Sequence, residues 1–462
     1  MQAGDLGWLG IVRLGLAQMA LGAIVVITTS TLNRVMVVEL ALPAILPGAL
    51  VALHHAMQLL RPRMGYGSDV GRRCTPWING GMAVLATGGV VAAAGTALMK
   101  GSVLQGLLLS IVGFVLIGIG VSACGTSVLV LLAKRVPAER RGAAATVVWL
   151  MMIAGFAITS TVAGKQLDPY SPARLVMVTA AVSAVALAVT LLATFRVEPA
   201  QTVAAAAVAS TVREPAAADK PAFWVALREV LAEPEARRFT VFIFVPMLAY
   251  SAQDLILEPF AGSHFHFTPG ESTQLSGAQH RGIFVGMLLV ALVTSQFRGR
   301  AVASLKAWVI GGAVASAAAL AGLSTAALGG GGWPLSANVF LLGLANGAFS
   351  IAAIGAMMAL ASKGRGSREG VRMGLWGASQ AIAFGGGGFV GTVLADLAKW
   401  LVGAVGSAYS FVFGLEALGF TVAAWLALHI AYGSTTRSTS PAAAVHSIPA
   451  HAGEGPLLSA AS

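Results

Sequence analysis

About twelve apolar segments, most of them long enough to cross a membrane as a helix, constrain this chain more than any motif. A helix needs about 20 predominantly apolar residues to cross the hydrocarbon layer of a bilayer. We expect crossings at residues 9–32, 42–60, 77–99, 104–132, 143–163 and 175–195, and again at 239–260, 283–297, 303–327, 335–361, 371–397 and 407–432. The sequence therefore predicts an all-α integral membrane protein of about twelve transmembrane helices in two six-helix halves.

Composition excludes a water-soluble protein. Hydrophobic residues make up 57% of the chain and charged residues only 10%, whereas a soluble domain carries about 25% charged residues. The net charge of +11 does not indicate a nucleic-acid partner, because the basic residues gather in short loops between the apolar segments, where they orient a membrane protein. We expect membrane lipid, and no nucleic acid, around this chain.

The distribution of lysine and arginine predicts the orientation. Alternate loops, including those that hold Arg73, Lys134 and Lys363, are rich in basic residues, and the loops on the opposite side are poor in them. Because basic loops stay in the cytoplasm, we expect both termini to be cytoplasmic in a bacterial inner membrane.

Four units are expected along the chain. They are a first six-helix half at 1–195, a cytoplasmic connection at 196–238, a second six-helix half at 239–432 and a disordered cytoplasmic tail at 433–462. Within the connection, Phe223, Trp224 and Leu227 recur at helical spacing, which predicts an amphipathic helix on the membrane surface.

The loop after the second segment contains glycines, one carboxylate and arginines in close succession. The residues are Gly65, Asp69, Arg72 and Arg73. This pattern resembles the loop motif of the major facilitator superfamily, although one residue between Asp69 and Gly71 is missing relative to the usual pattern. The resemblance implies a gating loop; an ordinary turn with arginines that set the topology is the alternative.

Three further stretches carry a more specific resemblance. They are Gln253-Asp254 with Glu258-Pro259-Phe260-Ala-Gly262, then Arg13-Leu-Gly-Leu-Ala-Gln18, and finally Thr31-Leu-Asn33-Arg34 with Glu39. Together they resemble the bacteriochlorophyll-delivery, or PucC-type, family of major-facilitator-like proteins. This resemblance implies a non-enzymatic assembly factor of the photosynthetic, intracytoplasmic membrane. It would handle bacteriochlorophyll as cargo, dock light-harvesting polypeptides, or both, without a covalent cofactor. Pigment-synthesis enzymes would be further partners.

The acids Asp254 and Glu258 are the strongest candidates for a site. They are four residues apart and share one helix face, and carboxylates inside a membrane are costly unless they are paired or hydrated. We expect them toward the periplasmic end of the seventh helix, which Pro259 helps to end. They would form a polar site between the halves, with Arg13 or Arg34 as counter-charge. A structural clamp at a helix end is the alternative.

The adjacent histidines His54 and His55 are candidate pigment ligands, since a neutral imidazole can ligate the central magnesium of a chlorophyll. Adjacent helical residues point about 100° apart, so at most one of them would face a given pigment. Hydrogen bonding to a neighbouring helix is the more ordinary role of such histidines. No metal-binding spacing is evident.

Two rival functions remain open. A proton-coupled secondary transporter of a small solute would use Asp254, Glu258 or Glu416. A membrane enzyme of pigment synthesis is less consistent with the sequence, which lacks the Asp-rich magnesium-diphosphate motif of a prenyl-transferring synthase.

Overall fold

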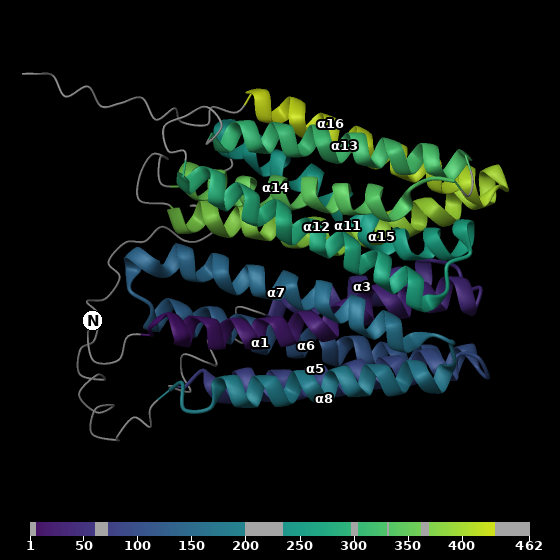
Figure 1. The fold of residues 1–462 in the computed structure, drawn as a ribbon, viewed down its shortest axis with the longest axis horizontal. Helices are drawn as coiled ribbons and strands as arrows, with labels where there is room; N and C mark the ends of the chain where they lie inside the picture. Colours follow the sequence, from purple (N-terminus) through teal and green to yellow (C-terminus); the bar gives the residue numbers. More distant parts are fainter. Residues whose placement is uncertain are drawn as a thin grey trace, which may run out of the picture.

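The computed structural model describes residues 6–60, 73–198, 234–296, 304–329, 332–361 and 369–429, and within these ranges the chain is helical apart from short turns (Figure 1). The first half contains α1 (Trp8–Val26), η1 (Ile27–Thr31), α2 (Leu32–Arg34), η2 (Val35–Glu39), α3 (Ile45–Met57), η3 (Gln58–Leu60), α5 (Thr75–Leu98), α6 (Val103–Arg135), α7 (Ala138–Leu167) and α8 (Pro172–Thr194). The second half contains α11 (Pro234–Phe265), α12 (Pro269–Gln296), α13 (Leu305–Gly329), α14 (Leu335–Ala361), α15 (Glu369–Val402) and α16 (Val405–His429).

The two halves lie side by side with their helices along the long axis of the molecule (Figure 1). One hydrophobic core is built almost entirely from residues before Glu198, and a second core from residues after Pro234. Nine helices in the described part of the chain are long and apolar enough to cross a membrane. The predicted fold class, an all-α membrane protein of two six-helix halves, is confirmed.

Several expectations fall on residues that the structure does not describe. The expected surface helix at Phe223, most of the 196–238 connection and the 433–462 tail lie outside the described ranges. The proposed unit boundaries therefore stay predictions.

The first helix is longer than the sequence indicates. Residues Trp8–Glu39 form one continuous 32-residue helical segment, with π-helical turns at η1 and η2. Arg34, which the expected crossing at 9–32 leaves in a loop, lies inside this helix and is 1% exposed. The buried charge is stable there because Glu39 and a backbone carbonyl pair with it. Turns of π-helix are rare and often occur at functional sites.

The eighth expected crossing also begins earlier than the sequence indicates. α12 starts at Pro269 rather than at residue 283, because its first three turns bury polar side chains against protein instead of exposing them to water. These side chains are Ser272, Thr273, Ser276, Gln279 and His280. Their polarity conceals the start of this helix, which therefore looks like part of a loop in the sequence.

Pro259 does not end the seventh crossing, contrary to expectation. α11 continues through it to Phe265. A proline lacks the N–H that would bond the carbonyl four residues earlier, which here belongs to Leu255. The side-chain amide of Asn33 donates to that carbonyl at 2.5 Å. A neighbouring helix therefore supplies the missing hydrogen bond, which is how membrane helices tolerate internal prolines.

Glu198, just after α8, ties that helix to the start of α5. Its carboxylate accepts hydrogen bonds from the backbone N–H groups of Cys74 (3.0 Å) and Thr75 (2.7 Å) and from the Thr75 hydroxyl (2.6 Å). Partial burial opposes ionisation, but these bonds and the charge of Arg73 outweigh it and lower the pKa of Glu198 below its usual value.

We expect Glu198→Gln to lower the free energy of unfolding by about 1–2 kcal/mol at neutral pH, because a charge-assisted bond to a helix N-terminus is lost. A carboxylate whose pKa is depressed by folding stabilises the fold above its unfolded-state pKa, and the effect disappears as the pH falls through the folded-state pKa. Unfolding of the purified chain in detergent, followed across this acid range, tests this. A difference between wild type and variant that persists at the acid end would contradict it.

Candidate functional site

A cavity between the two halves is the candidate site. Its volume is about 570 Å³, and its walls come from α3 and α7 of the first half and from α11, α12 and α15 of the second. A smaller pocket of about 140 Å³ continues it toward α1. Both spaces are lined by His55, Phe156, Asp254, His280 and Phe384.

Aromatic side chains form much of the cavity wall. The Phe156 ring meets the His280 ring edge to face, with centroids 4.9 Å apart. Tyr250 and Phe384 form a second such pair, at 5.6 Å, and Trp149 lines the space as well. An apolar pocket with a few placed polar groups is the usual form of a small-molecule site.

Two polar groups of the wall are held by hydrogen bonds. The Asp254 carboxylate accepts a hydrogen bond from the Gln279 amide at 3.0 Å. The ring Nδ1 of His280 donates to the backbone carbonyl of Ser276 at 2.8 Å. Our sequence reasoning missed Gln279 and His280 because it assigned them to a loop. One signal could have found them: residues 283–297 alone are too few to cross a bilayer.

A polar layer, buried except for Glu39, lies where the helical segment Trp8–Glu39 ends and α12 begins. We use "polar layer" for Thr31, Asn33, Arg34, Glu39, Glu258 and Thr273. Arg34 pairs with Glu39 at 2.5 Å and donates to the carbonyl of Phe267 at 2.5 Å.

The remaining members of the layer join the helical segment Trp8–Glu39 to the second half. The hydroxyls of Thr31 and Thr273 lie 3.1 Å apart, and Thr273 donates to Glu258 at 3.5 Å. Gly262 leaves room for the guanidinium, since a Cβ there would lie 3.0 Å from it.

Further contacts hold the halves together at the same end. Asp168 accepts hydrogen bonds from the Thr268 hydroxyl (2.7 Å) and the Gly270 N–H (3.2 Å), and Asp396 accepts one from the N–H of Ile45 (2.8 Å). In the other direction the cavity extends as far as Leu59, near the end of η3. The two halves are therefore joined by hydrogen bonds at this end of the bundle, and the cavity lies between them.

The predicted acids lie one turn apart but face different surroundings. Asp254 borders the cavity, whereas Glu258 is 1% exposed and lies in the polar layer. Of the two proposed counter-charges only Arg34 is near Glu258. Gln253 is fully buried, and its amide has no hydrogen-bond partner among the described residues.

The structure does not bring Arg13 and Gln18 to the acids. Arg13 donates to the carbonyls of Ala193 (2.9 Å) and Phe195 at the end of α8, where carbonyls lack helical partners. The Gln18 amide contacts the sulfur of Met152 at 3.4 Å. Their proposed binding roles stay predictions, as do those of the other candidates.

The two histidines of α3 point in different directions. His55 lines the cavity, whereas His54 is 1% exposed, and its backbone lies against Gly118 of α6. The Gln58 amide contacts His54 Nε2 at 3.1 Å and His55 Nδ1 at 3.2 Å. Of the predicted gating loop, Gly65, Asp69 and Arg72 lie outside the described residues, and Arg73 is exposed.

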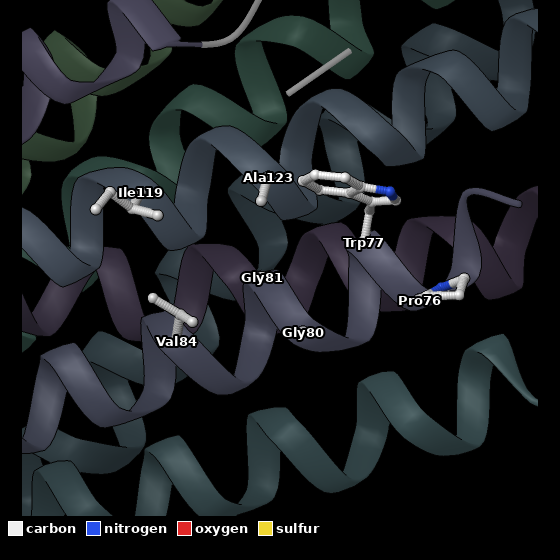
Figure 2. Close-up of a pocket in the computed structure, with 7 residues that line it drawn as sticks. All are labelled: Pro76, Trp77, Gly80, Gly81, Val84, Ile119 and Ala123. Carbon is white, nitrogen blue, oxygen red and sulfur yellow. The ribbon is translucent and has the colours of Figure 1, made fainter. Parts of the chain in front are cut away.

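A separate pocket of about 330 Å³ lies between α5 and α6. Figure 2 shows its wall, where the Trp77 ring lies near Ala123 and the remainder is proline, glycine and aliphatic side chains. It contains no residue of the predicted site. We use it below as a control position.

Comparison with known proteins identifies relatives. The family model described as "PUCC protein" matches residues 31–434. The chain is 51% identical to the "Bacteriochlorophyll synthase 44.5 kDa chain" of Rhodobacter capsulatus, over 91% of this chain and 95% of that protein. It is 28% identical to "Protein PucC" of the same organism, over 89% and 90% of the two chains.

Solved structures similar to this one are transporters. They include a peptide transporter POT in complex with sulfate (TM-score 0.64, 15% identity, 92% of this chain and 96% of that one). A bacterial homologue of the lysosomal transporter Spinster is also similar (TM-score 0.66, 14% identity, 91% and 96%). At such identities the likeness concerns the fold alone, and it confirms the predicted major-facilitator-like architecture.

Proposed function

Because this chain belongs to the PUCC protein family, we propose that it is a membrane assembly factor for bacterial light-harvesting complexes, which binds or delivers bacteriochlorophyll, antenna polypeptides or both. The aromatic cavity between the halves carries this proposal. Its walls suit a flat apolar ligand, and Asp254 and His280 offer fixed polar contacts within it. The relatives named for bacteriochlorophyll synthase and PucC support the same class of role.

We place the protein in the photosynthetic inner membrane with both termini cytoplasmic. The basic residues Lys134, Arg135, Arg140 and Arg141 support this orientation, since they lie in the last turn of α6 and the first turn of α7. The Arg135 carbonyl there accepts a hydrogen bond from the N–H of Leu6, just before α1. We further propose a binding role rather than catalysis, although one relative bears an enzyme name. Pigment-synthesis enzymes and antenna polypeptides are the proposed partners.

Purification of the tagged chain from a phototrophic host in mild detergent tests this function. We expect bacteriochlorophyll absorbance, small single-span polypeptides or both to co-purify with the chain. Ala56→Trp, which fills the cavity from α3, should lower the bound pigment about tenfold or more, because a ligand and the new ring cannot share the space. Val84→Trp adds the same ring to the separate pocket between α5 and α6 shown in Figure 2, and it serves as the matched control.

Wild-type protein that co-purifies with neither pigment nor antenna polypeptide would contradict the proposal. Equal loss of pigment in both tryptophan variants would contradict the assignment to this cavity.

A proton-coupled secondary transporter is the second candidate. The position of the Asp254 carboxylate favours it, because an ionisable group beside a cavity between the two halves can take up a proton together with a solute. Solute-driven proton uptake into vesicles that contain the purified chain, in the absence of bound pigment, would support this candidate over the first.

A further inference from the structure

We propose that His280 is the axial ligand for the central magnesium of a tetrapyrrole bound in the cavity between the halves. This inference rests on the proposed function and specifies the ligand class and the contact atom at the same site. No feature of the sequence singles out His280, because the polar start of α12 resembles a loop.

The tautomer of His280 suits this role. Its Nδ1 lies 2.8 Å from the carbonyl oxygen of Ser276, which can only accept, so Nδ1 carries the proton. In the neutral ring the other nitrogen, Nε2, therefore holds a lone pair. Histidines that ligate metals almost always donate their second ring N–H in this way, and a backbone carbonyl is a common acceptor.

Neighbouring groups hold the ring in place beside the cavity. His280 is 7% exposed and lines both the main cavity and its continuation. The edge-to-face contact with Phe156 fixes the ring from the first half. From the second half, the backbone of Gln279 packs so tightly on Gly343 of α14 that a Cβ at Gly343 would overlap it. A ligand nitrogen on such a support is preorganised.

Other ring nitrogens near the cavity are less suited. The Gln58 amide nitrogen is a donor, and it lies 3.2 Å from His55 Nδ1 and 3.1 Å from His54 Nε2. The lone pairs of those nitrogens therefore accept hydrogen bonds. His54 also belongs to the side of α3 that packs on α6. Among the three histidines, His280 combines a lone pair on Nε2 with a place on the cavity wall.

The surroundings favour magnesium in a macrocycle over a free metal ion. A free Mg²⁺ requires near-octahedral oxygen coordination, and the described residues contain no group of three His, Cys, Asp or Glu side chains that could hold a metal. Magnesium held by four ring nitrogens needs only an axial ligand. The apolar rings of Phe156, Tyr250 and Phe384 provide the flat walls that a macrocycle requires.

Binding of magnesium protoporphyrin IX and metal-free protoporphyrin IX to the full-length chain in detergent tests the ligand. Wild type should bind the magnesium form on the order of 10- to 100-fold more tightly, because loss of even a second-shell partner of a metal ligand has an effect of this size. His280→Leu should bind both porphyrins equally. His54→Leu is the control, because His54 lies on α3 and faces α6 instead of the cavity. This variant should keep the preference for the magnesium form.

A rescue experiment separates ligation from a structural role. In His280→Gly, added imidazole should restore the absorption spectrum of axially ligated magnesium porphyrin. If His280→Leu does not accumulate in the membrane, His280→Gly provides the same test. Its binding of the two porphyrins is then compared with and without added imidazole.

Two results would overturn the inference. One is a magnesium preference that persists in His280→Leu, and the other is wild type without any such preference. In both cases the proposed function stands if pigment or antenna polypeptides still co-purify with the wild-type chain. It fails separately if nothing co-purifies with it.

Discussion

Replacing Arg34 by methionine should remove most of this protein from the membrane. Arg34 is 1% exposed, pairs with Glu39 at 2.5 Å and donates to the Phe267 carbonyl at 2.5 Å. Glu258 lies within reach of the same charge. The Glu39 side chain is 31% exposed, but Glu258 is buried, and losing the cation beside buried acceptors costs about 3–5 kcal/mol.

The abundance of the variant in membranes and its unfolding midpoint in detergent measure this effect. Arg281→Met is the matched control, since Arg281 lies at the same end of the bundle but is exposed and donates to Thr161. We expect its effect to stay below about 1 kcal/mol. Normal abundance of the Arg34 variant would mean that the polar layer does not hold the helical segment Trp8–Glu39 to the second half.

The double variant Asp254→Asn with Glu258→Gln should have the opposite profile, with near-normal abundance and little function. The amides keep the size of the carboxylates, and the new Asn oxygen can still accept from Gln279. Burial of neutral amides also costs less than burial of charge. The carboxyl group that Asp254 presents to the cavity is lost, and so is the one near Arg34.

In a phototrophic host we expect the near-infrared antenna absorbance of membranes, normalised to the amount of this protein, to fall on the order of tenfold or more. This corresponds to one or two charge-assisted contacts of about 1.5–3 kcal/mol each. Glu271→Gln is the control, because Glu271 is exposed in the first turn of α12. Normal antenna absorbance in the double variant would leave the acids with a structural role only.

The single variants separate the two acids, which the sequence presents as one pair. Asp254 borders the cavity and Glu258 lies in the polar layer. We therefore expect Asp254→Asn to account for most of the loss of antenna absorbance, and Glu258→Gln for most of any change in stability.

A residue could be placed from the sequence only when its role depended on nearby residues in the chain. Roles that depend on partners far away in the chain could not be predicted. Asp254 and Glu258 stood out because a carboxylate within an apolar stretch is anomalous by itself. Arg13 and Arg34 could not be told apart, since both are basic residues at the edges of one apolar segment. Only packing showed that Arg13 bonds the end of α8, whereas Arg34 enters the polar layer.

The sequence by itself determined that lipid is the solvent, that about twelve helices cross it and that they divide into two halves, because the length and hydropathy of a crossing are local properties. Only the tertiary structure decided which polar groups meet. The polar start of α12 is helical because the bundle buries it, and α11 passes through Pro259 because Asn33, far away in the chain, bonds the carbonyl of Leu255. Such partners are set by contacts between helices, which no local pattern encodes.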